Sequence, residues 1–291
     1  MTNINDTLQL TNNPLIKAHE MNVLTYNDYF YRLKLLACSM FEWTGFPESV
    51  SIRFLEDTLF HFGKAVFIKD ESLGFMGLKV TSGGELNVYG DPVRYQAYGI
   101  GYSKMYNVDK CVLIRNNYLN KPTHTTIQLY ATRLYKVERT IDVNIEGQKF
   151  PRLIRCIKEQ ELTLKNIYNQ YEGNRPVIYV DKNFDASALS VLDTSSPYVA
   201  DKLMLYKHDL WNECMSFLGI SNANTDKRER LITDEVDSNN QLIQLAAETM
   251  LVTRKEAVEQ INKMFGLNVS VRQKEYEEIV ADFNGGEDDD I

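Results

Sequence analysis

The sequence predicts a mixed α+β fold in which long helices dominate and one segment forms a small β module. Apolar residues recur every three or four positions over residues 123–146 and again over 197–218, which is the spacing of amphipathic helices. Between residues 64 and 120, by contrast, short apolar runs are separated by SGG, GDP and GIG. Such residues are typical of the turns that connect strands in hairpins. With 291 residues, 44% of them hydrophobic, the chain can bury a substantial core.

The amino-terminal elements are predicted to be helices followed by strands. Apolar steps of three and four predict a helix from Thr25 to about Trp43, before Gly45 and Pro47. A second helix is predicted over residues 52–62, with Gly63 as its C-cap. The expected strands after it contain, in order, AVFIK, GFMGLKV, ELNVY and CVLIRN.

The carboxyl-terminal half is predicted to return to helix. The helix of residues 197–218 has Pro197 in its first turn and a glycine just past its end. PVIYV and NVSV read as strands, whereas residues 221–240 alternate in charge sign with few large apolar side chains and are predicted to form a mobile, solvated loop. Thr253 and Glu256 form a T-x-x-E capping box, which predicts that a last helix begins at Thr253 and closes at Gly266.

Charge is distributed unevenly along the chain. The formal net charge is −8, from 32 basic and 40 acidic residues, but residues 275–291 hold eight acids and no lysine or arginine. Residues 1–274 are therefore neutral, and the acidity is confined to one tail. Neither a signal peptide nor a membrane span is predicted, which indicates a cytosolic place of synthesis. Four widely spaced cysteines without metal-ligand spacing are predicted to be buried, reduced thiols.

The sequence contains no motif of a known active site. No window matches a phosphate-binding loop, and the G-x-G at Gly99 and Gly101 is predicted to be a strand turn. The four histidines lack a Ser or Cys partner in a nucleophile motif. The acidic run 288–290 follows two glycines and is more typical of a solvated tail than of a metal site. We therefore predict no catalytic residue, no metal and no cofactor.

Several longer stretches resemble the upper collar proteins, also called portals or head-tail connectors, of short-tailed phages of the Picovirinae, Salasvirus-like type. The resemblance runs in order over about residues 32–271 and is densest over 164–240. The matching stretches are FEW, FLEDTLFHFG, LKNIYNQYEGNRPVIY, SPYVADKL, WNECMSFLGISNANTDKRERLITDEVDSNN and INKMFGLNVSV.

The resemblance implies a mostly α portal fold with a small SH3-like β wing module, assembled as a ring at one capsid vertex, with twelve as the expected number of subunits. Such a ring conducts double-stranded DNA, and its expected partners are the major capsid protein, a lower collar or tail protein and a separate packaging ATPase. The implied localisation is the virion, after assembly in the host cytoplasm. The implied division is an N-terminal arm (1–22), a wing (23–63 and 64–120), a stem (121–220, with a clip region at 147–194), a channel loop (221–240), a crown-side helix and strand (241–274) and the acidic tail (275–291).

The resemblance also assigns the DNA-contacting residues of the channel. Lys202 in VADKL matches a channel-facing lysine, and Lys227 and Arg228, with Arg230 beside them, match the basic residues of the channel loop. Without the resemblance, Lys202 reads as an ordinary exposed helix lysine. A mobile loop of this kind is expected to hold DNA after packaging, so deleting residues 226–237 should leave ring assembly intact but let packaged DNA escape.

Two departures from the family pattern change the expected partners. Asp193 stands where relatives carry another channel lysine. One ring of positive charges is therefore missing, or is replaced by a ring of negative charges. Residues 1–22 contain only Lys17 as a cation, whereas relatives have a basic arm associated with a packaging RNA, which leaves an RNA partner in doubt. A neutral body suits a conduit, because each neutralised phosphate adds affinity that would slow passing DNA. The alternatives are a non-channel scaffold or adaptor of the virion and, third, a nucleic-acid-processing enzyme.

Overall fold

A computed structural model describes residues 14–148, 152–155, 177–180, 197–220 and 233–274. The chain divides into two compact units, which are treated separately below. The first comprises Met1–Arg133 with Leu210–Ile291, and the second is Leu134–Asp209. The two long helices α4 (His124–Gly147) and α6 (Ala200–Leu218) contribute residues to both units. Among the described residues, no helix is both long enough and apolar enough to cross a lipid bilayer.

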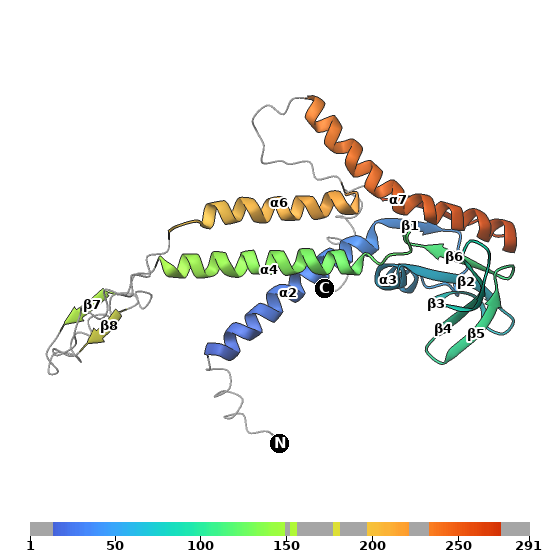
Figure 1. Cartoon of the computed structure of the whole chain (residues 1–291), viewed down its shortest axis with the longest axis horizontal. Helices are drawn as coiled ribbons and strands as arrows, with labels where there is room; N and C mark the ends of the chain where they lie inside the picture. The colour runs from blue at the N-terminus through green and yellow to red at the C-terminus, as the bar shows by residue number, and fades with distance from the viewer. Residues whose placement is uncertain (1–13, 149–151, 156–176, 181–196, 221–232, 275–291) are drawn as a thin grey trace, which may run out of the picture. The chain divides into compact units, whose positions relative to one another are not determined.

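The first unit is built around a five-stranded antiparallel sheet (Figure 1). Its strands lie in the order β5-β4-β3-β2-β6, so that a meander of four strands is closed on one side by the fifth. The strands are β2 (Lys64–Asp70), β3 (Gly74–Leu86), β4 (Pro92–Gly99), β5 (Tyr102–Asn107) and β6 (Cys111–Arg115). The remaining elements of the unit are α2 (Pro14–Ser39), β1 (Phe41–Thr44), α3 (Ile52–Phe62), α7 (Thr233–Phe265) and β9 (Ser270–Gln273).

Strand β2 is covered on both of its faces. Side chains alternate along a strand, so Val66 and Ile68 of β2 share one face, where they pack with Val80, Tyr95 and other buried residues of the sheet itself. The opposite face of β2 carries Phe67, whose ring contacts Phe265 of α7. Helix α3 packs on β2 and β3, and α7 packs on β6. The fully buried residues 65–68 are therefore the centre of the core.

The β module is confirmed, but two of its strand boundaries differ from the prediction. SGG, predicted to be a turn, lies inside β3, at a register shift between Gly83 and Leu86. Gly84 has φ +74°, a conformation that glycine adopts easily and that suits an irregular strand. The strand predicted from ELNVY was wrong, because β3 ends at Leu86 and a turn follows it. Strands β4 and β5, which are rich in polar residues and were not predicted, complete the sheet. The predicted turn at residues 99–101 is confirmed between β4 and β5.

The helices at the amino-terminal end are confirmed, but both ends of the first one differ from the prediction. Helix α3 begins after Ser51, whose hydroxyl accepts from the amide of Phe54, and ends at Gly63 with φ +74°, as predicted. Helix α2, however, begins at Pro14 and not at Thr25, and it ends at Ser39 and does not reach Trp43. FEW instead forms strand β1, which pairs antiparallel with β9, the strand predicted from NVSV. This partner lies some 230 residues away, so no local pattern could reveal the pairing.

Helix α7 corrects two further predictions. It begins at Thr233, so residues 233–240 are helical and not loop, whereas residues 221–232 lie outside the described residues. No glycine or proline interrupts residues 221–265, and acids near a helix amino terminus are favourable. The capping-box prediction at Thr253 was wrong, because this residue lies inside α7. Its hydroxyl donates to the carbonyl oxygens of Met250 (3.1 Å) and Arg115 (3.0 Å).

The second unit contains the facing parts of α4 and α6 and a two-stranded parallel sheet of β7 (Arg152–Arg155) and β8 (Val177–Val180). The predicted strand PVIYV is thus confirmed as β8. Helix α4 was predicted over 123–146, in close agreement with its observed bounds. Helix α6 starts three residues after Pro197 and ends before Gly219, which has φ +73°.

The described cysteines are free thiols. Cys111 and Cys214 are buried, as predicted, and Cys38 is half-buried. Burial raises the pKa of Cys214 to about 12 and that of Cys111 to about 11, so both remain protonated at neutral pH. Cys156 lies outside the described residues.

Candidate functional site: the paired helices α4 and α6

In the Leu134–Asp209 unit, one face of α4 packs against α6. Leu134, Val137 and Ile141 recur at helical spacing and are buried, whereas Ala200 is the buried residue at the start of α6. The helices run antiparallel, because the later part of α4 meets the beginning of α6 and Glu138 meets Lys207. This packing was predictable from the apolar period of each helix, but its register was not.

A side chain of α4 holds the start of α6. The amide nitrogen of Asn144 donates to the carbonyl oxygen of Pro197 (2.9 Å), and its oxygen accepts from the backbone amide of Val199 (3.0 Å). The first amides of a helix lack intrahelical partners, so this contact satisfies one of them from another helix. Asn144 is 5% exposed. No sequence motif indicated this role, because the partners are more than 50 residues apart.

The two lysines of this stretch of α6 are in different environments. Lys207 is half-buried and donates to Glu138 at 2.9 Å, so its charge is neutralised within the subunit. Lys202 is exposed and, in the part of the chain that the structure describes, has no carboxylate within ion-pair distance. The predicted residues Lys227, Arg228 and Arg230, and also Asp193, lie outside the described residues. Lys202 is thus the predicted DNA-contacting residue whose environment is known, and its charge is available to an external anion.

The outer faces of both helices carry large apolar side chains. Leu205 of α6 is 67% exposed and Val143 of α4 is 63% exposed. Ile145, Met204 and Tyr206 on the same segments are also exposed. Single exposed apolar residues are common. Five within two short helical segments are more typical of a surface that another protein contacts.

The same two helices also contact each other in the first unit. Tyr130 of α4 is hydrogen-bonded to Glu213 of α6, and burial together with this carboxylate raises the pKa of Tyr130 to about 12. Leu210, Cys214 and Leu218 form the buried face of α6 there. The neutral phenol therefore acts as a fixed hydrogen-bond donor between the helices.

A buried polar network centred on Arg254 fixes the start of α4 in the first unit. Arg254 of α7 is 2% exposed and forms a bidentate pair with Glu56 of α3, at 3.1 and 2.9 Å. It also donates to the carbonyl and side-chain oxygens of Asn116, whose amide nitrogen donates to Thr123 just before α4. Trp43 donates to the same Glu56 at 2.7 Å. Sequence analysis missed this network, because a lone arginine among charged helix residues reads as exposed.

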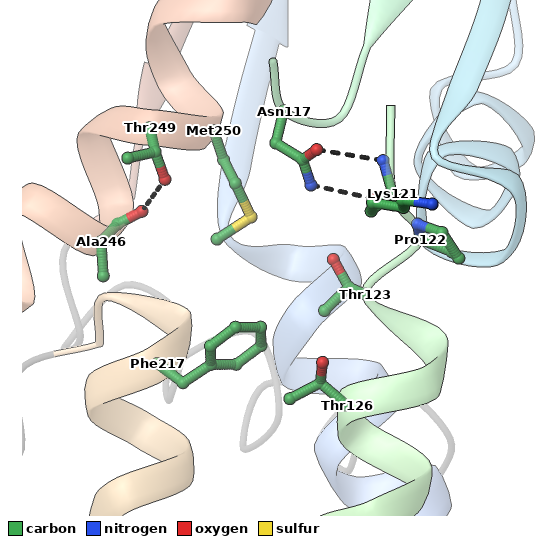
Figure 2. A pocket seen from close by; sticks show the side chains of 9 residues that line it. All are labelled: Asn117, Lys121, Pro122, Thr123, Thr126, Phe217, Ala246, Thr249 and Met250. Atoms are coloured by element: carbon green, nitrogen blue, oxygen red, sulfur yellow. Dashed lines mark hydrogen bonds between the residues drawn. The ribbon is translucent and has the colours of Figure 1, made fainter. Parts of the chain in front are cut away.

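A cavity beside this network has no acid, histidine or cysteine among its lining residues. About 330 Å³ in volume, it is bounded by the loop before α4 and by parts of α4, α6 and α7 (Figure 2). Its polar side chains bind their own segments: Asn117 pairs with both backbone groups of Lys121, and Thr249 donates to Ala246. Among the described residues, no three His, Cys, Asp or Glu side chains are grouped so as to hold a metal ion.

Comparison with known proteins now identifies the family. The model of the Phage Connector (GP10) family matches residues 11–280, which is most of the chain. The chain belongs to the phage connector family. It is accordingly a head-tail connector, a structural component of a phage virion. Among solved structures, the connector is similar to a chain of the portal and tail of native bacteriophage P68, with 16% sequence identity, 93% coverage of each chain and a TM-score of 0.48.

Proposed function

We propose that this connector forms a closed ring at one vertex of the capsid, through which double-stranded DNA is packaged and later ejected. Family membership is the observation that carries this proposal. Twelve subunits are the expected number. The proposed partners are the major capsid protein, a lower collar or tail protein and a separate packaging ATPase, while a packaging RNA stays in doubt because residues 1–22 contain only one cation.

The helix pair supplies the kind of surface that a ring requires. A cyclic assembly uses heterologous contacts, so each subunit must present two different complementary faces. Leu205 and Tyr206 project from α6 and Val143 from α4, and all three are exposed in the single subunit. Burying them between neighbours would remove this apolar surface from water, at about 25 cal/mol for each Å². The five-stranded sheet is proposed to be the SH3-like wing on the outside of the ring.

The charges of α6 suit weak contact with passing DNA. Among the residues that the structure describes, exposed Lys202 has no ion-pair partner, whereas Lys207 is neutralised by Glu138. Repeated by the symmetry of a ring, Lys202 would form a circle of single cations that centres the duplex through its phosphates without reading bases. Residues 221–232, which carry Lys227, Arg228 and Arg230, are proposed to form the adjacent channel loop that holds DNA after packaging.

Electron microscopy of the purified connector tests the assembly directly. The expected result is a closed ring whose central hole is as wide as a DNA duplex. A monomer, or an assembly without a hole, would favour a scaffold or adaptor role and contradict the conduit. A ring with metal-dependent nuclease activity would contradict the structural assignment.

The proposed role of Lys202 is tested by measuring the binding of purified rings to duplex DNA over a range of salt concentrations. Lys202→Gln should weaken binding equally for all sequences and reduce the salt dependence, because each lost phosphate contact lowers the log–log slope by roughly 0.9. Lys110→Gln, which removes an exposed charge from the β module, is the matched control. Equal effects of both variants would refute a specific role for Lys202.

A further inference from the structure

Two cations lie side by side at one end of the β module. Lys64 and Arg115 are direct partners in the register of β2 and β6, so their side chains leave the same face of the sheet. Both are half-buried. Like charges directly opposite each other on neighbouring strands are destabilising unless something neutralises them.

The described residues do not neutralise this pair. Lys64 Nζ makes a long contact of 3.4 Å with the hydroxyl of Ser82, and neither cation has a carboxylate within ion-pair distance in the described part of the chain. Together they line a depression of about 240 Å³, which also contains Leu113 and Tyr95. Asp91 lines the same depression without pairing with either cation, so the net charge of the lining remains positive.

We propose that this depression binds carboxylates of the acidic segment 275–291 of the same chain, with residues 287–290 as the main ligands. Those four residues are Glu-Asp-Asp-Asp, and the whole segment has eight acids and no basic residue. Its charge is complementary to the pair, whereas residues 1–274 are neutral as a whole. This inference does not rest on the proposed DNA channel.

The length of the segment allows the contact. It follows Lys274, whose backbone amide donates to Met40 at 2.8 Å within the same unit as the β module. Seventeen extended residues reach roughly 56 Å, which exceeds the ~30 Å diameter of a small domain. Because the segment is tethered, its effective concentration at the depression is on the order of millimolar, which favours it over a free anion of equal intrinsic affinity.

The volume of the depression favours carboxylate side chains over nucleic acid. A space of about 240 Å³ accommodates one or two such side chains, and a carboxylate accepts well from both guanidinium and ammonium donors. A DNA duplex is a continuous polyanion that would also approach Asp91. Occupation by the acidic segment would neutralise this pair and so remove one site where DNA could adhere to the β module.

Carbodiimide crosslinking of the full-length protein tests the proposal, because this reagent joins an amine to a carboxylate in contact with it. Peptide mass spectrometry should show Lys64 as the main lysine joined to residues 275–291. Lys104, which lies 3.3 Å from Asp70, provides an internal positive control, and exposed Lys110 provides the negative control. Raising the salt from about 0.05 M to about 1 M should reduce the Lys64 product about tenfold, since the contact is electrostatic.

Two full-length variants make the test decisive. Arg115→Gln should lower the yield of the Lys64 crosslink about tenfold, because one of the two cations is lost. A variant with Glu287→Gln, Asp288→Asn, Asp289→Asn and Asp290→Asn should abolish it, while the Lys104–Asp70 product stays constant in both. Equal coupling of the segment to Lys64 and Lys110, or an unchanged yield in Arg115→Gln, would overturn the proposal. Acetylation of the Lys64 amine gives a readout that does not need the acidic segment. If added duplex DNA protects Lys64 from acetylation equally in the parent chain and in the four-residue variant, the ligand is a phosphate, and the proposal is overturned.

Discussion

The β module and the paired helices expose their apolar residues in different kinds of element. In β2 of the module, residues 65–68 are all fully buried, because one face packs within the sheet and the other packs against helices. In the Leu134–Asp209 unit, α4 and α6 bury one face each and leave Leu205 and Val143 mostly exposed. The most exposed apolar residues of the module, Val88, Tyr89 and Ile100, lie in turns between strands. Those of the helix pair lie within regular helices, on a surface that a neighbouring subunit could cover.

Polar contacts follow the same contrast. Arg254 in the first unit is surrounded by buried partners from several elements, including Glu56 and Asn116. In the helix pair, polar contacts are fewer and local, such as the contact of Asn144 with Val199. A protein that must be rigid in one part and associate through another would need this division. The following predictions test it, from the largest expected effect to the smallest.

Removing the charge of Arg254 should destabilise the first unit most. Arg254→Met leaves the buried carboxylate of Glu56 without its partner, and breaking such a pair costs about 3–5 kcal/mol. Adding Glu56→Gln should recover most of this loss, because no unpaired charge remains and Trp43 keeps its acceptor. Urea unfolding monitored by tryptophan fluorescence measures both. If the free energy of unfolding of Arg254→Met lies within about 1 kcal/mol of that of the parent chain, the network is not important for stability.

Placing a charge on the exposed helix face should prevent assembly without unfolding the subunit. Leu205→Glu introduces a carboxylate where the ring model buries an apolar side chain, and an unpaired charge in an interface costs several kcal/mol, or at least a tenfold loss of assembly. Size-exclusion chromatography with light scattering measures the oligomer, and circular dichroism measures the fold. His208→Glu, at an exposed polar position of the same helix, is the control. Normal assembly of Leu205→Glu would place the interface elsewhere.

Loss of the Asn144 contact should loosen the helix pair and leave the β module unchanged. Asn144→Ala leaves the half-buried amide of Val199 without its acceptor, which costs on the order of 1 kcal/mol. Hydrogen exchange should therefore accelerate at the start of α6 but not in β2. Thr140→Ala, which removes an exposed hydroxyl from the same helix α4, should change hydrogen exchange little. Faster exchange in both regions would show that they unfold as one.

The smallest expected effect concerns the pH dependence of the β module. Hydrogen bonds from the backbone and hydroxyl of Ser72, and from Tyr102, hold the pKa of Asp70 well below its ordinary value of 3.8. Because the folded-state pKa is depressed, the carboxylate contributes stability above pH 4, and this contribution is lost as the pH falls towards the folded pKa. Asp70→Asn should therefore lower the midpoint temperature of thermal unfolding at pH 7. Between pH 4 and pH 2 this temperature should decrease less in the variant than in the parent chain. An unchanged acid profile would contradict this linkage.

Local patterns in the sequence predicted the elements whose signals lie within a few residues. Helices α3, α4 and α6 follow from their apolar period, and Gly63 and Gly219 mark two of their ends. The same reasoning failed for β1, because Phe41–Thr44 continues the apolar spacing of α2 and becomes a strand only by pairing with β9. It also failed at Thr253, where a capping sequence lies inside a helix that nothing interrupts.

The candidate site shows the same limit. The sequence and its family resemblance identified Lys202. They could not show that Lys207 is paired while Lys202 has no ion pair among the described residues, since Glu138 lies 69 residues from Lys207. They could not identify Arg254 either, because its partner Glu56 is 198 residues away and an arginine in a helix normally lies at the surface.

By itself, therefore, the sequence determined the positions of most helices and strands, the neutral body with its acidic tail, and membership of the connector family. Only the tertiary structure decided which charges are neutralised, which apolar faces stay exposed, and that Lys64 and Arg115 lie opposite each other. The physical reason is distance along the chain. Periodicity and capping act over one or two turns, whereas ion pairs, strand register and burial depend on residues that folding brings together from distant segments.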